Sequence, residues 1–484
     1  MRFEIDAFIK PPATESDEEA TSTHFEEDKS NDTSDQSQLV LLGSVIDAKI
    51  EKSADLDWFR FQGQKDQSLT IACRSHSLDG SVEPVMTLLD PFGNELLHSD
   101  ARQREPIIHC QLPATGEYRL RVNDRAYRSD DYSFYRVTIH DQPHVQSVFP
   151  RVTRAEALTL KAFGYRVDSA STQEWDWPVD LSADAFENNG PLVSTVARQV
   201  ANVRSPDAMG SVALSLAAGD LVIEEESVNN THQSAQLIPA KAHVSGRFLA
   251  RGDIDWYHFT AEKDKSYQIS VLGERLGQRM DLDVSIHDTS GKLILALPDL
   301  AAPKGAPAEF GLGSLDAEAT WKAPADANYL IAVRDLYGGG VFGPDRQYEL
   351  LLKPANPAFR VFATHALKKP SVGLSIAAGK DATIDVVALR ENGYAEPIEV
   401  TIENLPEGVT AEPCKLESKE TSKTIKITVA ENAEPSLHTL RLNAAGADKK
   451  AMPVQCVDMV RAGIARCSKG VPLLIFKPAS EKKE

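Results

Sequence analysis

Short runs in which apolar and polar residues alternate recur along most of the chain. Leu69, Ile71 and Cys73 alternate with more polar neighbours, and the segment 118–122 shows the same pattern. A period of two is typical of strands with one buried face. Turn sequences such as DPFGN, DTSG and PATGE separate the runs, at intervals typical of a sandwich or barrel. The pattern therefore predicts an all-β protein.

Two segments of the chain repeat one another. The stretch ADLDWFRFQGQKDQSLTIA, from Ala54, aligns with GDIDWYHFTAEKDKSYQIS, from Gly252. Asn31 and Asn229 stand 198 residues apart, like these two stretches, and the alignment needs no gap for about 70 residues. Later positions align at an offset of 211, so the second copy has a 13-residue insertion, which we place in PDLAAPKGAPAEFGLG. The repeat predicts two copies of one β-sandwich.

The other segments also have the pattern of strands, so we predict four tandem β-sandwich modules. The predicted order is a disordered acidic segment at 1–25, sandwiches at 26–141, 142–223, 224–356 and 357–458, and a solvated C-terminal tail at 459–484. The first segment is acidic and rich in Ser and Thr, a composition typical of disorder. The last sandwich contains the runs DATIDVVALR and SKTIKITVAE, which are rich in β-branched residues.

Charge and motifs narrow the classes of function. Lys and Arg number 52 and Asp and Glu 71, which gives a net charge of −19. This charge repels phosphate backbones, so we expect no nucleic-acid partner. The sequence contains no long apolar run, so we expect no membrane span. It also contains no Gly-x-Ser-x-Gly, His-Glu-x-x-His, P-loop or dinucleotide motif, so we expect no enzymatic activity.

Five cysteines are too few for a disulfide scaffold. Cys73 and Cys110 align with apolar residues of the second copy, at positions expected to face the core. They are either inert buried thiols or a disulfide between strands. The same two alternatives stay open for Cys414 and Cys456.

The repeated unit resembles the bacterial pre-peptidase C-terminal (PPC) domain, a calcium-stabilised, jelly-roll-like β-sandwich of secreted proteases and other surface proteins. The resemblance rests on the acidic opening at 225–231, the GDIDWYHF strand at 252–259 and the closing PADANYLIAVRD at 324–335. The segment 142–223, which begins PHVQSVFP after Gln142, resembles a TIG-type immunoglobulin-like module. The segment 357–458, with NLPEGV, resembles bacterial Ig-like repeats.

The PPC resemblance implies a calcium site in each copy. In the family, acidic and Asn side chains of the opening and the Asp pair before the aromatic strand supply oxygen ligands, the kind that Ca²⁺ requires. By position, the candidates are Glu27, Asn31, Asp55 and Asp57 in the first copy and Glu225, Asn229, Asp253 and Asp255 in the second. The family pattern has a second Glu two residues before the Asn, and at this position the first copy has Lys29 and the second copy has Ser227. The second copy is therefore the better candidate, because a lysine weakens a cation site.

The residues by themselves leave another interpretation of the Asp pairs open. Asp-x-Asp before a strand is also a common turn, in which the carboxylates accept backbone N–H bonds. Asp57 shares strand parity with Phe59 and Phe61, as Asp255 does with Tyr257. If the aromatic residues point inward, each Asp lies at the mouth of the core or is neutralised there, because an unpaired buried carboxylate is costly. This argument favours a cation or a nest of backbone N–H groups.

Two hypotheses about function follow. The first is a non-catalytic secreted or cell-surface protein with a binding, adhesion or spacer role. It would be a monomer whose partner is an extracellular protein or a polysaccharide, and the aromatic segments 174–177 and 337–343 are candidate contact surfaces. The alternative is the accessory region of a larger secreted hydrolase, above all a peptidase. Both imply an extracellular, cell-surface or periplasmic location. Since the first 20 residues lack the features of a secretory signal, that location implies a missing start.

Overall fold

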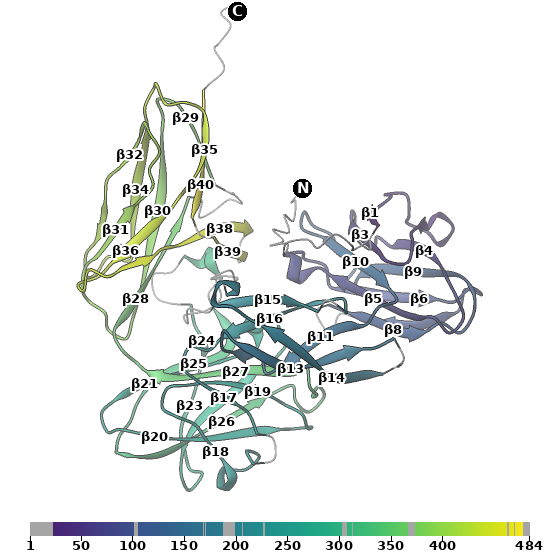
Figure 1. Ribbon diagram of the computed structural model, residues 1–484, viewed down its shortest axis with the longest axis horizontal. Coiled ribbons are helices and arrows are strands. Elements are labelled where there is room, and N and C mark those ends of the chain that lie inside the picture. Colours follow the sequence, from purple (N-terminus) through teal and green to yellow (C-terminus); the bar gives the residue numbers. More distant parts are fainter. Residues whose placement is uncertain are drawn as a thin grey trace, which may run out of the picture. The chain divides into compact units, whose positions relative to one another are not determined.

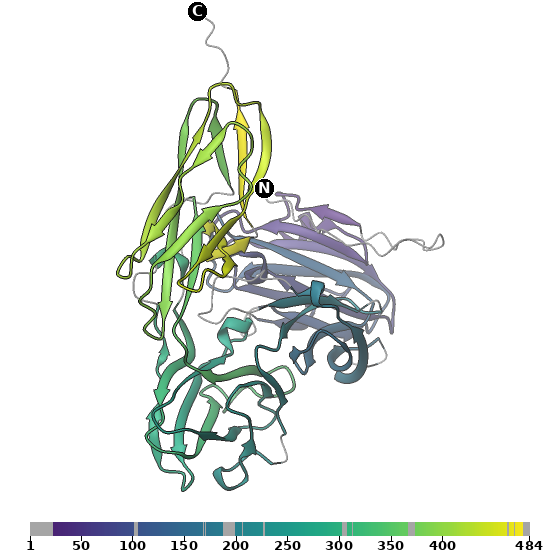
Figure 2. The ribbon, with the colours of Figure 1, turned by 60° about the vertical axis from the view of Figure 1, so that its left-hand side comes forward.

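The computed structural model describes residues 23–477, except 101–104, 168, 170, 187–198, 206, 226–227, 303–306, 312, 366–372, 462–463 and 469. The regular structure in these ranges consists of strands and one-turn 3-10 helices, as Figures 1 and 2 show. The prediction of an all-β protein is therefore confirmed. The chain divides into two compact units, Met1–Asp141 and Gln142–Glu484.

The first unit is built from two five-stranded sheets. One has the order β1 (His24–Glu26), β3 (Ser44–Lys49), β10 (Phe134–His140), β5 (Ser68–Arg74) and β8 (Ile107–Gln111). The other has the order β2 (Gln38–Leu39), β4 (Asp57–Gly63), β9 (Gly116–Asp124), β6 (Pro84–Leu89) and β7 (Glu95–Ser99). Their buried side chains form one core, in which Phe59, Phe61 and Tyr118 are fully buried. Residues 1–22 of the predicted disordered segment lie outside the described residues, and β1 already begins at His24.

Residues 220–354, in the second unit, repeat this strand order. One sheet has the order β17 (Asp220–Ile223), β19 (Ala242–Arg247), β27 (Gln347–Pro354), β21 (Ser266–Leu272), β25 (Ser314–Lys322) and β24 (Asp299–Leu300). The other has the order β18 (Gln236–Leu237), β20 (Ile254–Ala261), β26 (Ala327–Asp335), β22 (Leu282–Asp288) and β23 (Leu293–Ala296). Leu69 pairs with Cys110 in the first sandwich, and Tyr267 pairs with Trp321 at the aligned positions of the second. The sequence alignment therefore agrees with the strand register.

The predicted insertion of the second copy lies between β23 and β25. It contains β24 and the short helix η6 (Ala308–Phe310), to which no described element of the first sandwich corresponds. Phe310 is buried, and its ring centroid lies 6.0 Å from that of Phe362 in β28 (Ala358–Thr364). The insertion therefore packs against the C-terminal part of the same unit.

Two further cores lie in the second unit. Two three-stranded sheets lie within residues 144–216. One has the order β11 (His144–Phe149), β13 (Ala157–Tyr165) and β14 (Thr172–Asp180). The other has the order β12 (Val152–Thr153), β16 (Ser211–Leu216) and β15 (Val200–Arg204). From β28 onward, one sheet has the order β32 (Val409–Ala411), β34 (Ser422–Val429), β30 (Asp381–Glu391), β28, β38 (Gln455–Arg461) and β39 (Ile464–Ser468). A second sheet of this part has the order β29 (Leu374–Ala377), β40 (Val471–Phe476) and β35 (Ser436–Leu440). A third has the order β33 (Cys414–Leu416), β31 (Ile398–Ile402), β36 (Leu442–Ala445) and β37 (Ala451–Pro453).

The segment from residue 459, which we predicted to be a solvated tail, contains strands. β40 pairs with β29 in parallel and with β35 in antiparallel orientation. Val471, Leu473 and Ile475 alternate with more exposed residues and are buried in the last hydrophobic core. The tail prediction is wrong for these residues, because their period-two pattern supplies one buried face of a sheet. Residues 478–484 lie outside the described residues.

The structure pairs neither of the candidate disulfides, since Cys73, Cys110 and Cys414 are free thiols. Cys110 lies opposite Leu69, and the backbone N–H of Cys73 bonds to Pro106. The two thiols therefore stand four residues apart along adjacent strands, about 13 Å, which is beyond the reach of a disulfide.

Candidate cation site

The candidate residues of the first sandwich lie where β1 ends and β4 begins. Glu27 follows β1, and its Oε2 accepts the backbone N–H of Lys49 at 2.8 Å. Asn31 is buried, and its backbone carbonyl accepts the N–H of Trp58 at 2.9 Å. Asp57 opens β4 and is 1% exposed, on the same buried face as Phe59. The predicted inward direction of Asp57 is therefore correct.

Two carboxyl groups, those of Glu27 and Asp57, interact in this cluster. Burial and the neighbouring carboxylate of Glu27 raise the pKa of Asp57 to about 9. Burial also raises the pKa of Glu27 above its usual value. The hydroxyl of Tyr135 donates to Asp57 Oδ2 at 2.5 Å, which opposes the rise for Asp57 only in part. The described structure therefore places two carboxyl groups together without a cationic group that compensates both.

Several polar atoms in this cluster are buried and make no hydrogen bond. They are Asn31 Oδ1, Asn31 Nδ2 and Asp55 Oδ1. The other oxygen of Asp55, Oδ2, accepts the backbone N–H of Glu51 at 2.7 Å. A buried acceptor without a partner costs about 1–3 kcal/mol, so these oxygens are suited to a ligand.

The second sandwich has a matching cluster at the start of β20. Asn229 Nδ2 donates to Asp255 Oδ1 at 2.9 Å and to Glu224 Oε1 at 3.2 Å. The hydroxyl of Tyr348 donates to Asp255 Oδ2 at 2.6 Å. Asn229 Oδ1 and Asp253 Oδ1 are buried without a hydrogen-bond partner, as at the aligned positions of the first sandwich. The two sandwiches therefore leave the same pair of oxygens unsatisfied.

Glu225, which we predicted as a ligand in the second copy, is exposed, and Glu224 occupies the buried position. Glu224 donates its backbone N–H to Ser245, as Glu27 does to Asp47. Asp47 and Ser245 are 198 residues apart, whereas Glu27 and Glu224 are 197 apart. The second copy therefore has one additional residue before Asn229. The ungapped alignment missed it because three glutamates are consecutive there.

The lysine that approaches the first cluster is Lys52, not Lys29. Lys29 is exposed and pairs with Glu51. Lys52 Nζ lies 3.8 Å from Asp55 Oδ1 and also pairs with Asp32. Ala250 stands at the aligned position of the second sandwich. Ser227, the other departure from the family pattern, lies outside the described residues.

These clusters offer oxygen atoms and negative charge, the two properties that Ca²⁺ requires. No group of three or more His, Cys, Asp or Glu side chains within the described ranges has the arrangement of a metal site. An ion in either cluster would therefore rely on amide and backbone oxygens as well as carboxylates. Ca²⁺ accepts both kinds of oxygen. The unsatisfied Asn and Asp oxygens fit such an ion.

A buried Ser, Glu and His lie where residues 142–223 contact the second sandwich. Ser215 Oγ donates to Glu349 Oε1 at 2.6 Å, and His243 Nε2 lies 3.1 Å from Glu349 Oε2. The backbone N–H of Ala218 donates to His243 Nδ1, so Nε2 carries the proton. The serine hydroxyl donates to the carboxylate, and all three side chains are buried. This network joins two parts of one unit.

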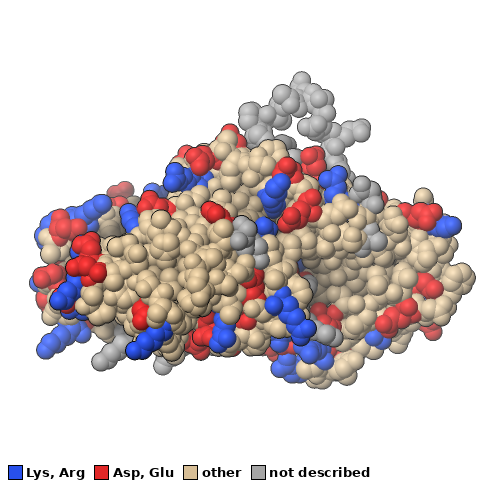
Figure 3. Space-filling view, turned by 90° about the horizontal axis from the view of Figure 1, so that it is seen from below, with Lys and Arg blue, Asp and Glu red and all other residues tan. Residues whose placement is uncertain are grey.

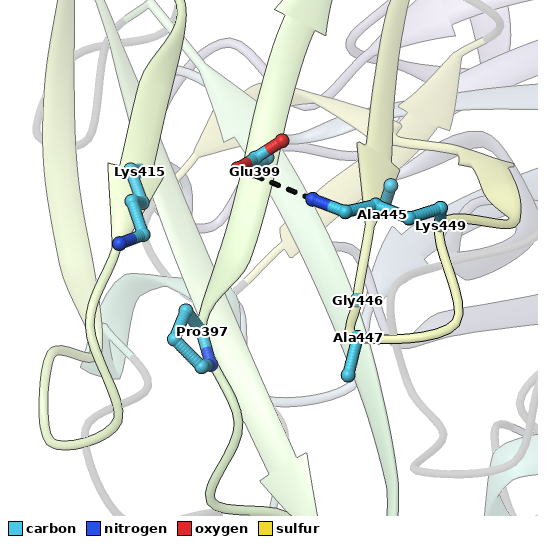
Figure 4. Close-up of a pocket in the computed structure, with 7 residues that line it drawn as sticks. All are labelled: Pro397, Glu399, Lys415, Ala445, Gly446, Ala447 and Lys449. Carbon is cyan, nitrogen blue, oxygen red and sulfur yellow. Dashed lines mark ion pairs between the residues drawn. The ribbon is translucent and has the colours of Figure 1, made fainter.

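A pocket lies at the edge of the last module, lined by Pro397, Glu399, Lys415, Ala445, Gly446, Ala447 and Lys449 (Figure 4). Its charged groups already have partners. Lys449 pairs with Glu399 at 3.5 Å, and Lys415 pairs with Glu417 at 2.8 Å. The pocket therefore offers a ligand little uncompensated charge.

Comparison with known proteins identifies one part of the chain. Residues 55–124 match the family model "Bacterial pre-peptidase C-terminal domain". No curated protein matched the chain. The pre-peptidase C-terminal domain of a collagenase from Bacillus anthracis is similar over 26% of this chain and 100% of that one, with 21% identity and a TM-score of 0.19. The S-layer protein rSbsC is similar over 86% of this chain and 53% of that one, with 11% identity and a TM-score of 0.16.

The structural likenesses have TM-scores too low to support an argument, so the family match is the finding that identifies the domain. The matched residues begin at Asp55, within the candidate cluster, and end at Asp124, the last residue of β9. They therefore include most of the first sandwich. The chain contains a pre-peptidase C-terminal domain at residues 55–124.

Proposed function

We propose that this chain is a non-catalytic secreted or cell-surface protein with a binding, adhesion or spacer role. Its second sandwich would be a further PPC domain, and Ig-like modules would occupy 142–223 and 357–458. Ca²⁺ would stabilise both PPC sandwiches. The PPC domain at 55–124 supports this proposal, because domains of this family are non-catalytic accessory domains of secreted bacterial proteins.

The observation that carries the calcium proposal is the pair of unsatisfied oxygens that recurs in both sandwiches. Asn31 Oδ1 and Asp55 Oδ1 correspond to Asn229 Oδ1 and Asp253 Oδ1. A folded protein satisfies the large majority of its buried polar atoms, so two matched exceptions beside buried carboxylates indicate a missing ligand. A cation would satisfy these oxygens and also offset the carboxylate charge.

Calcium bound at these sites would increase the stability of the folded sandwiches. Glu27, Asn31, Asp55 and Asp57 would hold the ion in the first sandwich, and Glu224, Asn229, Asp253 and Asp255 in the second. Each set joins the segment that enters the sandwich to the first residues of a central strand, β4 or β20. An ion bound only to the folded state would therefore oppose separation of this segment from the sheet.

The test is thermal melting of the full chain in EDTA and in millimolar Ca²⁺. Binding at 100 times the dissociation constant adds about 2.7 kcal/mol to the unfolding free energy, so Ca²⁺ should raise a melting temperature by several degrees. The variant Asp253→Asn/Asp255→Asn should lose the part of the shift that belongs to the second sandwich. The control Asp264→Asn/Asp326→Asn changes two exposed residues of the same sandwich and should keep it. Absence of any shift in the unsubstituted chain would refute the calcium role in both sandwiches.

The alternative function is the accessory region of a larger secreted hydrolase, above all a peptidase. The PPC domain favours it, because such domains typically accompany peptidases. A reading frame that encodes a protease domain beyond either end of this chain would support this alternative. A frame that ends at Glu484 and has a secretory signal upstream would support the first proposal.

The partner in the first proposal would be an extracellular protein or a polysaccharide, bound by a monomer. Acidic and basic side chains are interspersed on the face shown in Figure 3, with no continuous basic surface there. This distribution and the net charge of −19 disfavour nucleic acid. None of the helices in the described parts of the chain is long and apolar enough to cross a bilayer. Light scattering measures the oligomeric state, with one chain per particle as the expected result.

A further inference from the structure

Exposed apolar side chains are concentrated in one loop of the second sandwich. Residues 336–346 connect β26 to β27, and we call the first part of this connection, 336–343, the apolar loop. Its four large hydrophobic side chains are about half exposed: Leu336 54%, Tyr337 48%, Val341 45% and Phe342 47%. An added Cβ atom at Gly339 would meet no atom within 4 Å, so this turn projects into solvent. Several large apolar side chains exposed within one short loop indicate a contact surface.

The apolar loop is held in place by its backbone. Leu336 N–H bonds to Asp281 O, and Gly343 N–H bonds to Phe248 O, both at 2.8 Å. Gly338 O accepts the N–H of Gly252 at 3.1 Å. The carboxylate of Asp335 accepts the N–H of Tyr337 at 3.0 Å and pairs with buried Arg346. The apolar side chains are therefore presented to solvent by an anchored turn.

The fold does not require apolar residues at this place. The corresponding loop of the first sandwich, 125–132, contains Arg125, Arg128, Asp130 and Asp131. It is anchored in the same way, since Asp124 Oδ1 accepts the backbone N–H groups of residues 126 and 128. The same strand order thus supports a charged loop in one sandwich and an apolar loop in the other. The first loop exposes one large hydrophobic side chain, Tyr127 at 50%, so the concentration of four such side chains distinguishes the loop of the second sandwich.

We propose that the apolar loop inserts into the interfacial region of a lipid bilayer. Four half-exposed side chains offer much less area than the about 800 Å² that a stable protein interface buries on each partner. A convex tip of this size suits partial burial in lipid, where affinity scales with apolar area. Tyr337 can keep its hydroxyl at the headgroup level. The exposed Arg251 precedes Gly252, whose N–H bonds to Gly338 O, so its guanidinium can contact lipid phosphates beside the loop.

The chemistry of the loop disfavours a polysaccharide as the occupant. Sugars need hydrogen-bonding groups around an aromatic platform, and Leu336 and Val341 provide none. Membrane contact through this loop does not require a bound cation. The proposal is therefore independent of the calcium sites and can be tested in EDTA.

The experiment is flotation of the full chain with vesicles, in EDTA. Vesicles of phosphatidylcholine are compared with vesicles that also contain phosphatidylserine. The unsubstituted chain should float with both kinds. The variant Tyr337→Ser/Phe342→Ser should reduce the bound fraction about fivefold or more, because partitioning follows apolar area. The conservative variant Tyr337→Phe/Phe342→Leu should bind like the unsubstituted chain.

A matched control removes two other exposed apolar side chains of the same sandwich. Leu237 and Leu293 are 65% and 55% exposed, and Leu237→Ser/Leu293→Ser should leave vesicle binding unchanged. Circular dichroism establishes that each variant is folded before it is compared. No vesicle binding by the unsubstituted chain would overturn the proposal. So would an equal loss in the control, or binding of a polysaccharide or protein at this loop without binding to vesicles.

Discussion

The two sandwiches with the same strand order balance the charge of their buried aspartate differently. In the second sandwich, the amide of Asn229 donates to both Glu224 and Asp255. In the first sandwich, Asn31 Nδ2 makes no hydrogen bond, burial raises the pKa of both Glu27 and Asp57, and the carboxylate of Glu27 raises that of Asp57 further. The fold therefore places an acidic residue at the start of the strand, and its neighbours decide how its charge is compensated.

The surroundings of the two clusters differ as well. Lys52 approaches the first cluster, whereas Ala250 stands at the aligned position of the second. The hydrophobic cores differ at one aligned strand pair, which is Leu69 and Cys110 in the first sandwich and Tyr267 and Trp321 in the second. The second sandwich thus has the more aromatic core, and an alanine where the first has Lys52. The differences can be tested by matched substitutions.

The largest expected effect comes from the aligned core residues Phe61 and Phe259, both fully buried. Each change to Ala should cost about 3–5 kcal/mol of unfolding free energy, because it removes buried area and leaves a cavity. Phe259→Ala should cost more, since Phe259 contacts the rings of three other aromatic residues and Phe61 contacts that of Tyr118. Calorimetry, with hydrogen exchange to assign the transitions, measures both costs. Equal costs would contradict the proposed difference between the cores.

The next effect concerns the tyrosine hydroxyls that donate to the buried aspartates. Tyr348→Phe should cost about 1–3 kcal/mol, because the buried carboxyl group of Asp255 loses a hydrogen-bond donor. Tyr135→Phe should cost less, because the Tyr348 hydroxyl also takes part in a second buried hydrogen bond. Tyr348 also bonds to the hydroxyl of Tyr257 at 2.5 Å, whereas Phe59 stands at that position in the first sandwich. Urea denaturation in EDTA compares the two variants, and a larger cost for Tyr135→Phe would reverse the comparison.

A third expected effect is the pH dependence of the first sandwich without calcium. The pKa of Asp57 is about 9 in the folded state against an ordinary value of 3.8. Between these values the folded state holds more protons than the unfolded state, so stability falls as pH rises. The slope from this residue is at most about 1.4 kcal/mol per pH unit. Asp57→Asn should flatten the profile of unfolding free energy between pH 5 and about pH 8. An unchanged slope would show that Asp57 does not cause it.

The smallest expected effect is the influence of Lys52 on calcium binding. Lys52→Ala removes a positive charge 3.8 Å from Asp55 Oδ1. Calcium affinity of the first sandwich should rise by about threefold to tenfold, because a pair that is partly exposed contributes about 1 kcal/mol. Isothermal titration calorimetry measures the affinity. Lys65→Ala, which changes an exposed lysine of the same sandwich, is the control. If Lys52→Ala leaves the calcium affinity unchanged, this lysine does not weaken calcium binding in the first sandwich.

Much of the fold could be predicted because strands and repeats leave local patterns. The inward direction of Asp57 followed from its parity with Phe59, and the strand order of the second sandwich followed from the repeat. The exchange of Glu225 for Glu224 could not be predicted from residue identities. A one-residue insertion inside a run of glutamates leaves no mismatch, yet in a strand it moves a side chain to the other face.

The sequence by itself determined the all-β class, the repeated sandwich and the buried place of the two aspartates. These properties depend on alternation along a strand and on identity between two copies, which are local or linear features. Only the tertiary structure decided which glutamate faces Asn229, that Lys52 approaches Asp55, and that the cysteines of adjacent strands are too far apart to pair. Such contacts join residues that are distant in sequence. Their distances depend on strand register and loop geometry, which residue patterns do not specify.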